Sequence, residues 1–113
     1  MSPRPARVTP HELCVLWPTT PSDDPVAEVA RQLALNLERA IGGRSVREVA
    51  RITGVDRATV GAVLNGLSWP DIVTLAKLES GLDASLWPAR ALAGPQRETL
   101  RAAQPATAGD GLA

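Results

Sequence analysis

The chain has 113 residues, no formal net charge at pH 7, one histidine and one cysteine. This length suffices for a single domain with a modest core, and the charge balance argues against a strongly basic protein that coats nucleic acid nonspecifically. The apolar runs are too short for a membrane span or a secretion signal, and Cys14 has no second cysteine with which to form an internal disulfide. We therefore expect a cytoplasmic protein.

Residues 1–22 contain five prolines and are predicted to form an extended N-terminal segment. Arg4 and Arg7 could form a basic arm that enters the minor groove of DNA, but we favour a disordered start because chain termini are commonly disordered. The apolar run Leu13–Trp17 is expected to be extended and to cover the first helix or a partner subunit, because it would otherwise expose an aggregation-prone patch.

A first helix is predicted between Asp24 and Gly42, because Asp24 is a good N-cap and Pro25 suits the first helical position. The adjacent acidic pair Asp23-Asp24 is therefore interpreted as a cap and not as an acid–base site. Apolar residues recur at helical spacing and predict the buried side of this helix: Val26, Val29, Ala30, Leu33, Leu37 and Ile41.

Residues 45–66 indicate two short helices joined by a tight turn. Ser45 and Glu48 have the spacing of a capping box, so the first of these helices should begin at Val46. It should end at Thr53, because Gly54 can take the left-handed conformation that terminates a helix.

The second helix of this pair should follow Asp56, another good N-cap, and should close at Asn65-Gly66. Its apolar residues predict a buried side made of Val60, Val63 and Leu64. The opposite side is predicted to be free and is led by an arginine, followed by small residues that let a helix approach a surface closely: Arg57, Ala58, Gly61 and Ala62.

This segment resembles the helix-turn-helix of phage repressor/Cro-like (XRE-type) proteins. The residues that carry the resemblance occupy the family's small, turn and packing positions: Ala50, Gly54, Val60, Val63 and Asn65-Gly66. Two positions depart from the family pattern, because Val46 stands where Gln is frequent and Thr53 stands where an apolar residue is frequent.

The resemblance implies a recognition helix over Arg57–Asn65 that enters the major groove of double-stranded DNA. It places five residues toward the bases: Asp56, Arg57, Ala58, Gly61 and Ala62. Residues near the DNA backbone are expected to be Ser45, Val46, Arg47, Arg51, Thr59 and Asn65, with Arg47 and Arg51 on one face of the preceding helix.

A fourth helix is predicted after Ser68-Trp69-Pro70-Asp71, with Gly81 as its C-cap and a core stripe of Ile72, Leu75, Ala76 and Leu78. A short fifth helix should span Asp83 to Trp87 and end at Pro88. The resemblance extends through Leu86-Trp87-Pro88. The predicted fold is thus an all-α, compact, five-helix, repressor-like domain over residues 23–90, followed by a flexible tail over residues 91–113.

No catalytic or metal site is predicted. His11 and Cys14 could both reach one metal ion, but two ligands fall short of what zinc requires, and the pair is interpreted as incidental. Residues 44–66 contain four arginines and two acidic residues, so their net charge of +2 concentrates positive charge on the two-helix motif. Guanidinium groups bind phosphates and guanine edges in a bidentate manner.

These features predict a sequence-specific transcriptional regulator, a repressor, that binds double-stranded DNA as a homodimer and is not an enzyme. No cofactor, small-molecule ligand or membrane partner is expected. The alternative is a protein-interaction module, of antitoxin or anti-repressor type, that keeps the fold and holds another protein through Leu13–Trp17.

Overall fold

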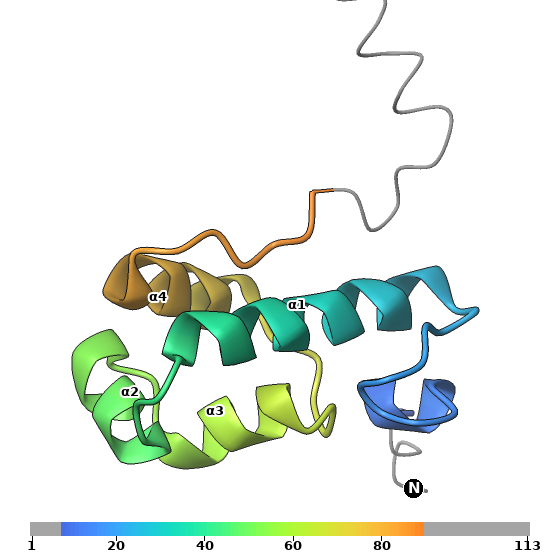
Figure 1. Ribbon diagram of the computed structural model, residues 1–113, viewed down its shortest axis with the longest axis horizontal. Helices are drawn as coiled ribbons and strands as arrows, with labels where there is room; N and C mark the ends of the chain where they lie inside the picture. The colour runs from blue at the N-terminus through green and yellow to red at the C-terminus, as the bar shows by residue number, and fades with distance from the viewer. Residues whose placement is uncertain (1–7, 90–113) are drawn as a thin grey trace, which may run out of the picture.

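The computed structural model describes residues 8–89, which fold into four α-helices and one 3-10 helix (Figure 1). In chain order these elements are η1 (Pro10–Leu13), α1 (Pro25–Ile41), α2 (Val46–Thr53), α3 (Arg57–Leu64) and α4 (Ile72–Leu82). In Figure 1, α1 crosses the centre, α2 lies near its C-terminal end, and η1 lies near its N-terminal end. The predictions for Arg4, Arg7 and the tail over residues 91–113 fall outside the described residues.

Helix α1 confirms the predicted boundaries. The Asp24 side chain accepts hydrogen bonds from the backbone N–H groups of Val26 and Ala27, at 3.0 and 2.9 Å. Gly42 follows the last turn with φ of 63°, and the helix ends at Ile41. Val26 is the one predicted core residue of α1 that is exposed, at 59%, so its assignment was wrong. Val26 lies on the solvent side of the first turn, whereas Ala27 of the same turn is fully buried.

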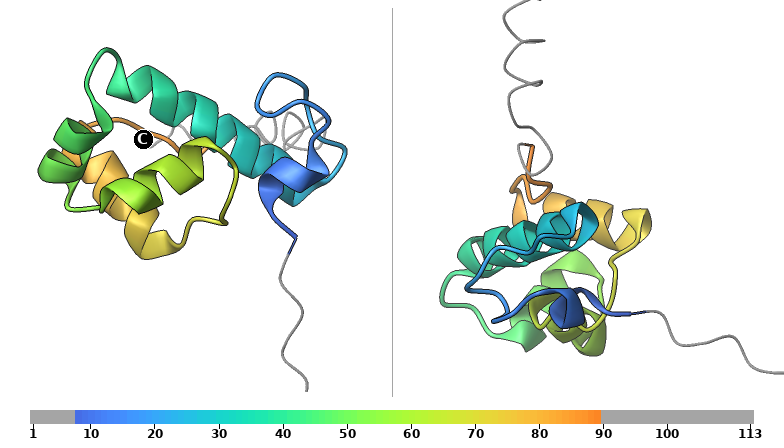
Figure 2. Two further views of the ribbon diagram at one scale, coloured as in Figure 1. Left: turned by 90° about the horizontal axis from the view of Figure 1, so that it is seen from below. Right: turned by 90° about the vertical axis from the view of Figure 1, so that its right-hand side faces the viewer.

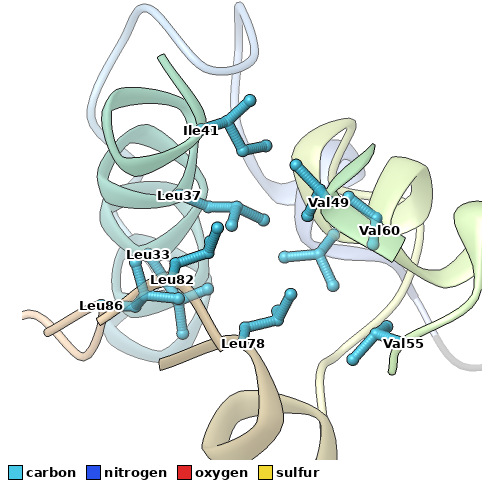
Figure 3. Close-up of a cluster of buried hydrophobic side chains, with 10 residues drawn as sticks. Leu33, Leu37, Ile41, Val49, Val55, Val60, Leu78, Leu82 and Leu86 are labelled. Atoms are coloured by element: carbon cyan, nitrogen blue, oxygen red, sulfur yellow. The ribbon is translucent and has the colours of Figure 1, made fainter. Parts of the chain in front are cut away.

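The core is built from apolar side chains of all four α-helices and of the segments between and after them (Figure 3). Its buried members are Leu33, Leu37, Ile41, Val49, Val55, Val60, Val63, Leu78, Leu82 and Leu86. Helix α3 packs against both α1 and α2, and α4 packs against α2. Because α3 contributes one apolar side to this core, its opposite side faces away from the domain.

Helix α4 begins as predicted, because the Asp71 side chain accepts a 2.7 Å hydrogen bond from the backbone N–H of Thr74. The predicted end at Gly81 was wrong: the helix continues to Leu82, and Asp83 takes the left-handed conformation with φ of 52°. A Cβ atom at position 81 would lie 2.7 Å from the Cα of Thr53. Glycine is therefore needed there for the close approach of α4 to α2.

The inner side of α4 also differs from the predicted stripe. Leu78 is fully buried and Leu75 packs against the core, as predicted. Ile72 is 83% exposed and Ala76 is exposed, whereas Leu82, one turn after Leu78, is buried. The buried side is set by contact with α2 and begins one turn later than the apolar pattern indicated.

The fifth helix predicted over Asp83–Trp87 does not form. These residues make an irregular turn instead, in which one carboxylate oxygen of Glu79 accepts the backbone N–H groups of Leu86 and Trp87, at 2.7 and 3.1 Å. That carboxylate satisfies donors that a helical turn would otherwise use, and it carries Leu86 into the core. The fold is all-α, with four α-helices and a 3-10 turn in place of five helices.

The N-terminal region, residues 8–22, is folded back on the domain and is not extended as predicted. It contains η1 and a series of turns, shown in blue in Figure 2. The expectation that the run Leu13–Trp17 covers α1 holds only in part: η1, which ends at Leu13, packs against α1, whereas Val15 and Leu16 are 87% and 63% exposed. Contact of this run with a partner subunit stays a prediction. Over residues 8–89, no helix has the length and apolar character needed to cross a membrane.

Candidate nucleic-acid interface

The turn between α2 and α3 has the predicted glycine geometry. Gly54 is left-handed, with φ of 78° and ψ of 10°, and its N–H donates to the carbonyl of Ala50 at 2.9 Å. The buried Thr53 hydroxyl donates to the carbonyl of Val49 at 2.7 Å and accepts the N–H of Val55 at 3.2 Å. Threonine at a position where the family often has an apolar residue is thus accommodated, because its hydroxyl satisfies a buried backbone donor of the turn.

The start of α2 realises one half of the predicted capping box. Ser45 Oγ accepts the N–H of Glu48 at 3.1 Å. The Glu48 carboxylate turns to Arg51 instead of returning to the backbone of Ser45: Arg51 Nη2 lies 2.6 Å from one carboxylate oxygen and Nε lies 3.2 Å from the other. The guanidinium of Arg51 lowers the pKa of Glu48 through these hydrogen bonds.

The start of α3 is capped by Asp56, whose carboxylate accepts the N–H of Thr59 at 3.1 Å. Hydrogen bonds from Thr59, first from its side chain and then from its backbone, lower the pKa of the Asp56 carboxyl. Asp56 was predicted to face bases. Its side chain is exposed, but the carboxylate is already engaged in holding the first turn of α3.

Small residues follow Arg57 on the outward side of α3. Arg57 and Ala58 are exposed, and Gly61 and Ala62 are half-buried, whereas Val60 and Val63 are buried on the other side. A Cβ atom added at Gly61 would meet no atom of the protein within 4 Å. Position 61 therefore borders open space, and the backbone of α3 is accessible to a surface there.

The arginines of the motif divide into engaged and available groups. Arg44 donates to the carbonyls of Ala40 and Ile41 at the end of α1, at 2.8 and 3.1 Å, and Arg51 is paired with Glu48. Arg47 and Arg57 are exposed, and neither has a hydrogen-bond or ion-pair partner among residues 8–89. The sequence placed Arg47 and Arg51 together on one face and did not distinguish the available guanidinium from the engaged one.

The other predicted backbone-contact residues are differently placed. Asn65 is exposed and directly follows the last residue of α3. Its side-chain amide donates to the carbonyl of Gly61 at 2.9 Å. Thr59 is half-buried, and Val46 packs against the core, so its side chain is directed inward. At position 46 a phosphate could be reached by the exposed start of the helix and not by the valine side chain.

Two hydrogen bonds to the end of α3 and the turn after it were not foreseen from the sequence. Trp17 Nε1 donates to the carbonyl of Leu64 at 2.9 Å, and the N–H of His11 donates to the carbonyl of Gly66 at 2.9 Å. Close by, Trp69 Nε1 donates to the carbonyl of Val8 at 2.8 Å. Trp17 and Leu64 are 47 residues apart in sequence, so no local pattern could have linked them.

The described residues 8–89 bring no three His, Cys, Asp or Glu side chains together as a metal site would require. Cys14 is buried, and its thiol donates to the carbonyl of Thr20 at 2.9 Å.

Residues 35–86 match the model of a helix-turn-helix family (HTH_3). The match begins within α1, includes α2, α3 and α4, and ends at the buried Leu86; residues 8–22 lie outside it. No curated protein and no solved structure matches the chain at a significant level.

Proposed function

We propose that this chain, whose residues 35–86 form an XRE/Cro/C1-type helix-turn-helix domain, is a sequence-specific regulator of transcription. A domain of this type implies DNA binding. In the proposed mode of binding, α3 lies in the major groove and α2 crosses the DNA backbone. The observation that carries the proposal is the outward side of α3, where an available arginine precedes small residues and position 61 borders open space.

Arg57 is the proposed base-reading residue. It occupies the first position of α3, and its exposed guanidinium has no partner among the described residues. The planar fork of a guanidinium matches the O6 and N7 acceptors of guanine. Ala58, Gly61 and Ala62 offer few hydrogen-bond donors, so their proposed role is to permit close approach and apolar contact with thymine methyl groups.

Arg47 is the proposed backbone-contact residue of α2. It is exposed and available, whereas the guanidinium of Arg51 would have to be shared with Glu48 or released from it before it could neutralise a phosphate. The exposed start of α2 beside Ser45 adds the favourable end of a helix dipole for a phosphate.

The short length of α3 favours a homodimer that binds a DNA site with two-fold symmetry. Helix α3 has eight residues, a length of about 12 Å at the usual rise per residue, and reads only a few base pairs. Two copies separated by about one helical turn of DNA, ~34 Å, would supply the missing specificity. A dimer bound over a promoter would exclude other proteins from it, and repression is therefore the proposed direction of regulation.

Three arginine variants test this assignment on a duplex taken from the DNA upstream of the gene and on a scrambled duplex, at two salt concentrations. Arg57→Ala should cost about 1 to 3 kcal/mol of binding free energy on the upstream site and little on the scrambled one. Arg47→Ala should weaken both and reduce the salt slope by about one unit. Arg51→Ala is the matched control on the same face, and its effect should be smaller because its charge is paired.

Equal proportional losses on the two duplexes for Arg57→Ala would reject base reading by this residue. Light scattering of the chain, free and bound to DNA, tests the dimer, and a monomer in both states would contradict it.

The alternative function, a protein-interaction module, has one observation in its favour. Val15 and Leu16 are adjacent apolar residues that are 87% and 63% exposed in the N-terminal turns. An exposed apolar pair of this kind suits a protein partner. If the wild-type chain binds no DNA but recovers a stoichiometric partner, and a folded Val15→Ser/Leu16→Ser variant loses that partner, the alternative would be favoured over a DNA-binding regulator.

A further inference from the structure

Residues 8–22 lie outside the helix-turn-helix match, yet they contact the end of α3. The indole N–H of Trp17 donates to the carbonyl of Leu64, the last residue of α3, and the N–H of His11 donates to the carbonyl of Gly66. The carbonyls at the end of a helix have no partners within the helix. The N-terminal region therefore supplies donors that α3 itself lacks.

The contact between Trp17 and Gly66 is close-fitting. Gly66 is buried and left-handed, with φ of 67°, and a Cβ atom there would lie 2.7 Å from Cε2 of Trp17. The indole ring thus covers the turn that follows α3, in addition to bonding its final carbonyl. Both observations fix the indole ring against the same end of the helix.

The next residue of the chain is tied to α1. The carbonyl of Pro18 accepts a 2.9 Å hydrogen bond from Nη1 of Arg31. Arg31 is 8% exposed, and its Nη2 lies 2.6 Å from a carboxylate oxygen of Glu28. The same carboxylate accepts the N–H of Ser22 at 2.7 Å. The hydrogen bond from Arg31 lowers the pKa of Glu28 to about 2, so this ion pair stays charged at neutral pH.

Trp17 and Pro18 are consecutive, so the chain joins the end of α3 directly to a partly buried ion pair on α1. An eight-residue helix has little stability of its own and depends on its contacts for its position. Helix α3 also packs directly on α1, and Val63 of its last turn lies in the core. This connection therefore adds a restraint from α1 at the end of α3, beyond the packing of Val63.

We propose that residues 8–22 form a brace that holds α3 in its DNA-binding orientation, and that Trp17 is the positioning residue of this brace. The inference rests on the proposed function, since the orientation of α3 matters to binding only if α3 contacts DNA. It adds to the helix-turn-helix a positioning element that lies outside the matched segment.

The variant Trp17→Phe tests the brace, because it removes the indole N–H and retains an aromatic ring. At a temperature where both proteins are fully folded, its dissociation constant on the upstream duplex should rise roughly three- to tenfold as the competent orientation becomes less populated. Amide hydrogen exchange should accelerate at Asn65, Gly66 and Leu67, whose N–H groups bond to carbonyls of α3, and should stay unchanged at the core residue Val60. A role in general stability alone would not produce exchange confined to this turn.

Trp87→Phe is the matched control, since Trp87 is 55% exposed and lies after α4, away from the brace. It should leave both the affinity and the exchange at residues 65–67 unchanged. A less than twofold change in affinity for Trp17→Phe, together with unchanged exchange at residues 65–67, would overturn the proposal.

A measurement on the wild-type chain keeps the test independent of folding of the variant. The indole N–H of Trp17 should exchange more slowly than that of Trp87, both free and on DNA; equal exchange rates in the complex would also overturn the brace. If the wild-type chain binds no DNA, the proposed function fails, whereas the exchange at residues 65–67 in Trp17→Phe still decides whether the brace orders the end of α3.

Discussion

The helix-turn-helix and the N-terminal brace are held by different kinds of contact. In the helix-turn-helix, the caps at Ser45 and Asp56 and the turn at Gly54 act within three or four residues along the chain. In the brace, Trp17 reaches a carbonyl 47 residues away, and Pro18 is bonded to Arg31 on α1. Short-range contacts define the shape of α3, and long-range contacts fix its orientation in the domain.

The largest effect is expected where a long-range contact supports the helix-turn-helix itself. Gly81→Ala should destabilise the fold by about 3 kcal/mol, because its Cβ would lie 2.7 Å from a backbone atom of Thr53 and 2.8 Å from the carbonyl oxygen of Ile52. Chemical denaturation measures the change. Ser80→Ala, on the exposed side of the same helix, is the control and should be nearly neutral. A loss below that of the local turn variant Gly54→Ala would show that α4 and α2 are not in close contact.

The ion pair that anchors the brace to α1 gives the next largest effect. Glu28→Gln should destabilise the chain by about 2 kcal/mol at pH 7, since it leaves the buried Arg31 without its counter-charge. The pKa of Glu28 is lowered from 4.5 to about 2, so its contribution is complete above pH 4.5 and is lost as the pH falls toward 2. The stability difference between wild type and variant should therefore shrink over this range.

Thermal denaturation of both proteins across that pH range tests the prediction. Glu38→Gln serves as a control, because Glu38 is exposed on the same helix. A difference that is constant with pH, or that grows on acidification, would contradict the role of the charged pair.

The local turn should be less costly to change. Gly54→Ala should destabilise by about 1 to 2 kcal/mol, because the left-handed backbone is strained for residues with a Cβ although the space beside it is open. Ser45→Ala should cost about 1 kcal/mol for the lost cap. Thermal denaturation that ranked Ser45→Ala as the more damaging change would show that the turn at Gly54 tolerates a side chain.

Adding a methyl group on the outward side of α3 should raise the stability of the fold and lower its affinity for DNA. Gly61→Ala should stabilise the free chain by up to about 1 kcal/mol, because alanine favours the helix and its Cβ meets nothing within 4 Å. The same methyl group should weaken binding to DNA if the backbone of α3 approaches the groove closely. Thermal denaturation and duplex titration of one protein sample measure both. A variant that is stabilised and binds DNA as well as wild type would exclude close approach at this position.

The parts of the fold that could be predicted from sequence are those with short-range causes. The boundaries of α1 and α2, the start of α3 at Arg57 and the cap of α4 at Asp71 all follow from residues within one turn. The end of α4 could not be predicted, because Gly81 serves a contact with α2 and its place near the helix end resembles a cap. The absent fifth helix has a similar cause, since the Glu79 carboxylate captures the N–H groups of Leu86 and Trp87.

The candidate site divides in the same way. The outward side of α3 could be predicted from the spacing of Val60 and Val63, which bury the opposite side. The pairing of Arg51 with Glu48 is short-range, three residues apart on α2, but the sequence pattern assigns Glu48 to the capping box with Ser45 and so did not distinguish Arg51 from the available Arg47. The brace could not be predicted, since the partners of Trp17 and His11 are carbonyl groups, which every residue carries.

The proposed function requires that the chain recognise a particular DNA sequence through α3. Selection of duplexes from a random library by the purified wild-type chain, followed by sequencing, tests it most directly. The proposal predicts enrichment of one motif, an inverted repeat whose half-sites are centred about one helical turn apart, with a guanine whose enrichment disappears in Arg57→Ala. Recovery of duplexes with no sequence enrichment, under salt conditions where the chain binds DNA, or no binding at all, would contradict it.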